Sequence, residues 1–453
     1  MGVVQHMVSA AGGGRGHLPC MPKMYSNLRT IMLVSIGGSL VFYDFVVLAY
    51  LTPVIGKLFF PPGVANWLAM VQTFGIFAAG YLFRPLGGIV LGHFGDLFGR
   101  KRLFAFSILL MSISMVGIAV LPTYAYIGVA APLLLIGMRI LQGIAIGGEV
   151  PGAWTLVAEQ MPRNQVGLAC GLVSSALASG MLLGAAVVAI VNSTFQPSEV
   201  EAFAWRIPFV IGALFGLPAI YARWWLKETP VFTGLSERRT LVPELPLKAI
   251  LRDHLKAIVL SMLLTWALSA TILVTGLMTA TLLQTVYGFS AQHALLATSI
   301  GAMALVIGNV LFGAIIDRIG PGLSLMAGSL FFALASFAFY SLAGLSVTTL
   351  YLLYFAMGLA VGLVTAVPYV MVMVFPARVR VTGISFSYNI AYAVFGGLTP
   401  AVLAWLVEFD PMAPAYYMLF IAALAFALGA FIRLDREMLE PHSDDVEMGT
   451  WGK

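Results

Sequence analysis

A charged stretch between two long apolar runs of this chain reads Gly92-His93-Phe94-Gly95-Asp96-Leu97-Phe98-Gly99-Arg100-Lys101-Arg102. A second copy, Gly313-Ala314-Ile315-Ile316-Asp317-Arg318-Ile319-Gly320, lies in the other half of the chain. Both copies place Asp four residues after the first Gly, and another Gly three residues later. A polar turn repeated at matching places in two apolar halves predicts one helical bundle used twice. Duplicated bundles are the usual architecture of secondary transporters, whose substrate site lies between the halves.

The composition predicts a membrane protein. Of the 453 residues 60% are hydrophobic and only 9% are charged, whereas about a quarter of a soluble domain is charged. Crossing the hydrocarbon core takes about 20 apolar residues, which must be helical because lipid offers backbone groups no hydrogen bonds. Twelve stretches meet this requirement: 28–51, 67–91, 103–122, 130–158, 166–191, 205–226, 257–286, 292–316, 323–343, 347–374, 381–407 and 412–433. The expected fold is an all-α membrane protein, with twelve transmembrane helices in two six-helix bundles related by internal duplication.

The longest polar stretch divides the chain into two halves. It runs from Lys227 to Lys256, between the sixth and seventh predicted spans, and contains many charged residues together with Pro230, Pro243 and Pro246. We therefore expect a cytoplasmic tail at 1–27, an amino-terminal bundle at 28–226, a cytoplasmic linker at 227–256 that is helical near Leu247 to Leu255, a carboxy-terminal bundle at 257–434 and a second cytoplasmic tail at 435–453.

The net charge of +5 is explained by membrane topology and not by nucleic-acid binding. All but four of the 24 Lys and Arg residues lie on one side of the predicted spans, the exceptions being Lys57, Arg84, Arg139 and Arg206. The positive-inside rule then places both termini in the cytoplasm, which agrees with an even number of spans. We expect a multi-pass protein of the cytoplasmic membrane, in contact with lipid and without a nucleic-acid partner.

Four ionisable residues lie inside the predicted spans, all in the amino-terminal half: Asp44, Arg84, Arg139 and Glu149. Each costs roughly 2.5–3.5 kcal/mol on membrane-insertion scales, so such residues indicate a function. An arginine can hold a substrate carboxylate through two parallel hydrogen bonds, and a buried carboxylate can take up and release a driving proton. In the alternative interpretation, the four charges pair with one another and hold the bundle together.

The two Gly-Asp-Gly stretches have a physical rationale of their own. Each glycine permits a tight turn, and an aspartate at a helix start binds unpaired amides at the positive end of the helix dipole. Repetition in both halves favours a gating role over a topology signal alone, although the second copy lacks the basic triplet of residues 100–102.

Other classes of site are not indicated. No cluster has metal-ligand spacing, no nucleophile and base stand out as a pair, and the Gly-rich runs inside spans do not match a phosphate-binding loop. We therefore expect no metal, no cofactor other than a coupling proton, and no enzymatic activity.

Further motifs follow one another along nearly the whole chain: Tyr43-Asp44-Phe45, Phe83-Arg84-Pro85-Leu86-Gly87-Gly88, Arg139-Ile140-Leu141-Gln142-Gly143, Gly147-Gly148-Glu149 with Glu159, Lys227-Glu228-Thr229-Pro230-Val231-Phe232, Arg380-Val381-Thr382-Gly383 and Tyr388-Asn389. With the stretch at 92–102, they resemble the major facilitator superfamily and, within it, the metabolite:proton symporters. The resemblance implies alternating access, with protons entering alongside a small metabolite.

The resemblance also assigns roles to residues of this chain. The expected substrate-binding residues are Arg84, Arg139, Tyr43, Gln142, Tyr388 and Asn389, and the expected proton-coupling residues are Asp44 and Glu149. The expected gating residues are Gly92, Asp96, Gly99, Arg100, Asp317 and Glu159.

The expected substrate is a small organic acid. The segment Tyr126-Ile127-Gly128-Val129-Ala130-Ala131-Pro132 and the segment after Phe395 are most similar to citrate and tricarballylate carriers. Import of a di- or tricarboxylate such as citrate, by a monomer, is therefore our first expectation. Two alternatives stay open: a proton symporter for a zwitterion such as proline or betaine, and a transporter-like sensor that binds without moving substrate.

Overall fold

The computed structural model of the chain consists of helices and connecting turns. It describes residues 23–61, 76, 79–224, 228–237 and 246–440, and these residues contain no β-strand. Eleven helices or continuous helix runs in the described part are long and apolar enough to cross a membrane. The remaining predicted span, 67–91, begins outside the described residues and continues into α3 (Arg84–Phe98). The predicted all-α membrane fold is confirmed.

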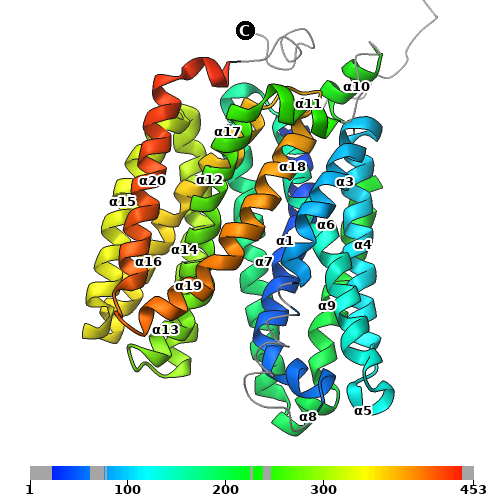
Figure 1. Cartoon of the computed structure of the whole chain (residues 1–453), viewed down its shortest axis with the longest axis vertical. Helices are drawn as coiled ribbons and strands as arrows, with labels where there is room; N and C mark the ends of the chain where they lie inside the picture. Colours follow the sequence, from blue (N-terminus) through cyan, green and yellow to red (C-terminus); the bar gives the residue numbers. More distant parts are fainter. Residues whose placement is uncertain (1–22, 62–75, 77–78, 225–227, 238–245, 441–453) are drawn as a thin grey trace, which may run out of the picture.

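The helices form two bundles that lie side by side (Figure 1). The first bundle contains α1 (Lys23–Phe59), α3, α4 (Arg100–Val120), α6 (Ala130–Gln160), α7 (Val166–Thr194) and α9 (Ile207–Trp224), with the short helices α5 (Tyr124–Ile127) and α8 (Pro197–Ala202). The second contains α12 (Leu255–Leu273), α13 (Thr279–Thr285), α14 (Ala291–Ile319), α15 (Pro321–Leu342), α16 (Val347–Val361), α17 (Ala366–Val374), α18 (Arg380–Ala391), α19 (Gly397–Val407) and α20 (Ala413–Leu434).

Two spans of the second bundle pass through a π-helical segment. The segment η3 (Val274–Met278) joins α12 to α13, and η6 (Tyr392–Gly396) joins α18 to α19. The wider turn of a π-helix interrupts the regular hydrogen-bond ladder and is frequent at functional sites. Both segments contribute residues to the cavity described below.

The connecting helices α10 (Pro230–Glu237) and α11 (Pro246–Asp253) lie at one end of the molecule, with the last helical turn η7 (Arg436–Leu439). We name this end the α11 end and the opposite one the α8 end. The ribbons of the two bundles approach each other at the α11 end and diverge toward the α8 end (Figure 1).

Helix α11 confirms the helix expected within the linker. The predicted domain boundaries stay predictions, because 1–22, 225–227, 238–245 and 441–453 lie outside the described residues.

The helix ends agree with the predicted spans within four residues, except in α1 and α3. Helix α1 extends further in both directions, and α3 continues through Phe98. The predicted polar turn at 92–102 is therefore helical except at Gly99, whose φ of 108° is in the left-handed region that favours glycine. Gly320 has the same role in the second copy, with φ 83°. Gly92, by contrast, lies inside α3 and not in a turn.

Small residues bring α3 and α6 into backbone contact. A Cβ atom on Gly147 would lie 2.4 Å from the carbonyl oxygen of Arg84 and 2.5 Å from the amide nitrogen of Gly88, closer than Cβ atoms approach such atoms in real proteins. Gly137, on the same helix, has no atom within 4 Å of the corresponding position. Close approach at small residues is a general way of packing membrane helices.

We expect Gly147→Ala to lower the stability of the folded protein by about 1–3 kcal/mol, because the new methyl group forces α3 and α6 apart. The matched variant Gly137→Ala should be neutral or slightly stabilising, since alanine is the better helix former. Thermal unfolding of both purified variants in detergent checks this. Equal melting temperatures for the two would show that the contact between α3 and α6 adapts freely.

Candidate substrate cavity and gate

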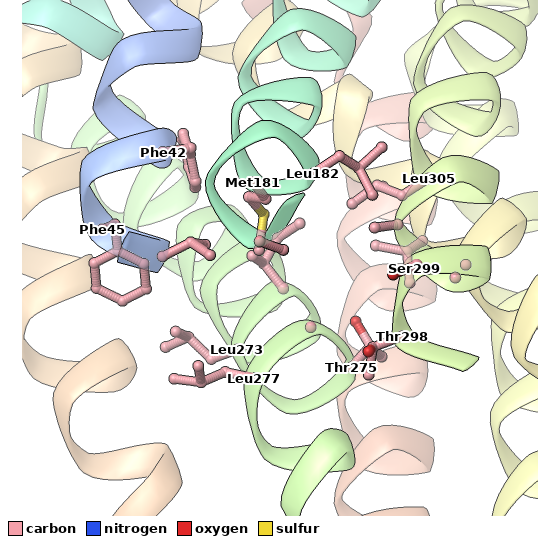
Figure 2. A pocket seen from close by; sticks show the side chains of 18 of the residues that line it. Phe42, Phe45, Met181, Leu182, Leu273, Thr275, Leu277, Thr298, Ser299 and Leu305 are labelled. Atoms are coloured by element: carbon pink, nitrogen blue, oxygen red, sulfur yellow. The ribbon is translucent and has the colours of Figure 1, made fainter. Parts of the chain in front are cut away.

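A cavity lies between the two bundles, lined by residues of α1, α3, α6 and α7 from the first bundle and of α12, α14, α16 and both π-helical segments from the second. Its wall is mainly apolar and aromatic, with Phe42 and Phe45 on one side and the hydroxyl residues Thr275, Thr298 and Ser299 on the other (Figure 2). Among the lining residues that the structure describes, Arg84 alone carries a charge. An enclosed apolar pocket with a few polar groups is the usual form of a small-molecule site.

Arg84 is held by tyrosine rings. Its guanidinium carbon lies 4.2 Å from the ring centre of Tyr392, 5.5 Å from that of Tyr388 and 5.6 Å from that of Tyr81. The rings of Tyr81 and Tyr392 are stacked 6.0 Å apart across the boundary between the bundles. Arg84 is 8% exposed, and no carboxylate of the described residues lies within ion-pair distance of it. Its buried Nε has no hydrogen-bond partner among the described residues, so a donor of Arg84 is available to an anionic group in the cavity.

Arg139 is paired inside the first bundle. Its guanidinium donates to Asp44 at 2.9 Å and also to Gln142, while the Gln142 amide donates to Asp44 at 3.0 Å. All three side chains are buried, and they line a small second cavity together with Arg84. The pairing that the sequence left open is therefore settled for Asp44 and Arg139, whereas Arg84 stands outside it.

The other predicted binding and coupling residues lie farther from the main cavity. Glu149 is buried on α6 and accepts a hydrogen bond from Ser107. Tyr43 points into the first bundle, where its hydroxyl donates to the carbonyl of Pro208 at 2.8 Å. Asn389 donates to the carbonyl of Gly147 at 2.8 Å and so joins the bundles. Their predicted roles stay predictions.

Each Gly-Asp-Gly copy binds the start of a helix in the opposite bundle. Asp96 accepts the amides of Val381 (3.3 Å) and Thr382 (2.8 Å), in the first turn of α18. Asp317 accepts the amides of Gly167 (2.7 Å) and Leu168 (2.8 Å), in the first turn of α7. Both aspartates lie near the end of their own helices. They therefore do not cap a helix of their own bundle, as the position of an aspartate beside a glycine turn had suggested. The first-turn amides of a helix have no intrahelical partner and favour an anion.

Glu159 binds arginines from both bundles at the α11 end. Arg100 and Arg380 both donate to Glu159 Oε1, at 3.4 Å and 3.1 Å, and the Nε of Arg100 lies 3.4 Å from Oε2. Arg100 also donates to the carbonyl of Ala377 at 2.7 Å. The sequence counted Arg380 only among the basic residues of the cytoplasmic side, and the structure buries its side chain completely. Together with the two aspartate contacts, these bonds join the two bundles at the α11 end, and the predicted gating role of these residues stays a prediction.

A residue from the start of the linker completes this cluster. The Glu228 carboxylate accepts the amides of Arg100 (3.1 Å) and Lys101 (3.2 Å), in the first turn of α4. One carboxylate oxygen of Glu228 would lie only 2.3 Å from a Cβ atom on Gly99, so Glu228 occupies the space that a side chain there would need. Phe232 covers the guanidinium of Arg100 at 5.2 Å. The Glu228 to Phe232 motif was noticed in the sequence, but nothing local to it showed that it contacts α4.

We expect Asp96→Asn to weaken closure of the α11 end, because an amide cannot replace a carboxylate that accepts from two amides at a helix start. A cysteine at Ser385, which lies between α3 and α18 against Gly92, reports the opening. In a background without Cys20 and Cys170, its labelling by a thiol reagent in detergent should accelerate about ten-fold. The matched variant Asp410→Asn, which removes a similar carboxylate bond to Met412 in an exposed loop, should leave the rate unchanged. Equal labelling in both would remove Asp96 from the gate.

Residues 34–400 match the model of the Major Facilitator Superfamily. The chain belongs to the Major Facilitator Superfamily. A putative proline/betaine transporter of Staphylococcus aureus (strain COL) is 33% identical over 414 residues, covering 90% of this chain and 88% of that protein. The proline/betaine transporter of Salmonella typhimurium is 30% identical and covers 88% of this chain and 82% of its own.

The fold also matches a solved member of the superfamily. The structure of the proton:xylose symporter XylE bound to 6-bromo-6-deoxy-D-glucose superposes with a TM-score of 0.78 at 17% identity, covering 95% of this chain and all of that one. The predicted family is confirmed, and this superfamily chain is a multi-pass membrane transporter and not an enzyme. The names of the relatives agree with the zwitterion alternative better than with citrate.

Proposed function

We propose that this chain is a proton-coupled symporter that imports a small zwitterion such as proline or betaine. The observation that carries the proposal is the cavity itself, in which Arg84 is the one charged residue among the described lining residues. A single guanidinium matches a single carboxylate. A tricarboxylate would place two further anionic groups in an apolar wall, where an unpaired charge is expensive.

Three further properties belong to the proposal. Asp44, held between Arg139 and Gln142 beside Arg84, is the first candidate for the coupling proton, and Glu149 is the second. The protein lies in the inner membrane, and its α11 end faces the cytoplasm because most basic residues belong to that side. The working unit is a monomer surrounded by lipid, since one chain contains both walls of the cavity.

Uptake into proteoliposomes tests the function. Labelled proline, betaine, citrate, tricarballylate, 2-oxoglutarate and shikimate are compared with and without an inward proton gradient. We expect concentrative uptake of proline or betaine that a protonophore collapses. Concentrative uptake of citrate would overturn the substrate class. Uptake that ignores the gradient would leave a carrier without proton coupling, and binding without uptake would support a sensor.

A further inference from the structure

Among the described residues, the wall of the cavity that the second bundle provides carries five hydroxyl groups, of which that of Tyr392 belongs to a ring that lies against Arg84. The other four are considered together. Thr275 belongs to η3, Thr298 and Ser299 belong to α14, and Tyr354 belongs to α16. Figure 2 shows the first three on the side of the cavity away from Phe42 and Phe45. All four belong to the second bundle, whereas Arg84 belongs to α3 of the first bundle, and we name the four the hydroxyl face.

Each of these hydroxyls already donates its proton to a backbone carbonyl. Thr275 donates to Thr271 at 2.6 Å, Thr298 to Ala294 at 2.9 Å and Ser299 to Leu295 at 2.8 Å. The Tyr354 hydroxyl donates to the carbonyl of Thr275. A hydroxyl has one proton and two lone pairs. With the protons used, these oxygens offer only acceptors to a ligand.

The two walls therefore have opposite hydrogen-bonding character. Arg84 has donors and no acceptor, whereas the hydroxyl face has acceptors with their donors engaged. A ligand that spans the cavity needs acceptors at one end and donors at the other. A carboxylate facing Arg84 and an ammonium with N–H groups facing the hydroxyls satisfy both walls, through charge-assisted hydrogen bonds.

A fully methylated nitrogen has no N–H to donate and would rely on aromatic faces instead. Two of the rings that could serve, Tyr81 and Tyr392, lie against the guanidinium of Arg84, which is itself a cation. Resting on the proposed function, we propose that the hydroxyl face selects substrates whose cationic nitrogen carries N–H, so that amino and imino acids are preferred to betaines. Thr275 and Thr298 are then specificity-determining residues.

The test is a methylation series on one carbon skeleton. Proline, N-methylproline and N,N-dimethylproline compete for uptake of labelled proline into proteoliposomes. We expect the inhibition constant to rise about ten-fold or more from proline to the dimethyl compound, the usual effect of losing a charged hydrogen bond. Thr275→Val and Thr298→Val should weaken proline and leave the dimethyl compound within about two-fold, while Thr298→Ser keeps the hydroxyl and the native ratio.

The matched control is Thr265→Val. Thr265 is buried on α12 and donates to Ser261 at 2.7 Å, but it does not line the cavity, so the ratio should not change. Equal or better inhibition by the dimethyl compound, or an unchanged ratio in both cavity variants, would overturn the hydroxyl-face proposal and leave the zwitterion symporter intact. If none of the three compounds competes and citrate is taken up, the proposed function itself fails and this inference fails with it.

Discussion

Arg84→Lys is expected to raise the KM for a carboxylate substrate by on the order of 10- to 100-fold. A lysine keeps the positive charge but loses the planar fork that can bind both carboxylate oxygens and that lies over the ring of Tyr392. The loss corresponds to about 1.5–3 kcal/mol, the range for hydrogen bonds to charged groups. The measurement is initial uptake over a substrate series in proteoliposomes, at matched protein content.

Two controls separate this role from a structural one. Arg206→Lys changes another arginine stacked on a ring, 4.3 Å from the centre of Trp205, that does not line the cavity. It should transport normally. Prolinol keeps the ring and the ammonium of proline but has no carboxylate, so Arg84→Lys should barely change its inhibition constant. An equal loss for proline and prolinol, or normal uptake by Arg84→Lys, would remove Arg84 from carboxylate binding.

The four charged residues inside the spans could be singled out from the sequence, because an ionisable residue in an apolar span is rare and costly. Their partners were not, because a contact between two helices depends on how each is rotated about its axis. Asp44 and Arg139 lie on α1 and α6, and nothing local distinguishes a pair from two separate groups. Tyr388 was among the predicted binding residues, but the contact of Tyr392 with Arg84 could not be predicted for the same reason, since it depends on how the second bundle packs against α3.

The gate shows where a local rule fails. An aspartate near a glycine turn predicts capping of the next helix in the chain, but Asp96 binds the start of α18 and Asp317 binds the start of α7. The repeat could be recognised in the sequence. The contacts that each copy makes with a helix of the opposite bundle depend on the whole fold. The burial of Arg380 could not be predicted for a related reason, because its partner Glu159 lies on α6 of the other bundle, far away in the sequence.

The second large effect is expected at the buried pair of Asp44 and Arg139. Asp44→Asn leaves the Arg139 guanidinium buried without its anion, and breaking one partner of a buried ion pair costs about 3–5 kcal/mol. We therefore expect a much lower thermal unfolding temperature in detergent and a loss of concentrative uptake. Glu201→Gln is the matched control, because its partner Lys57 is exposed and such surface pairs contribute at most about 1 kcal/mol.

The double variant Asp44→Asn with Arg139→Gln separates stability from coupling. It removes both charges, so much of the lost stability should return, because a neutral pair needs no buried counter-ion. Accumulation should stay absent if Asp44 carries the driving proton, even where exchange of labelled substrate across the membrane persists. If the single or the double variant still concentrates substrate under an inward proton gradient, the proton travels on another group, and Glu149 beside Ser107 becomes the residue to change. If the double variant is as unstable as Asp44→Asn, the unpaired arginine is not the cause of the instability. The loss of stability then comes from the packing of α1 against α6.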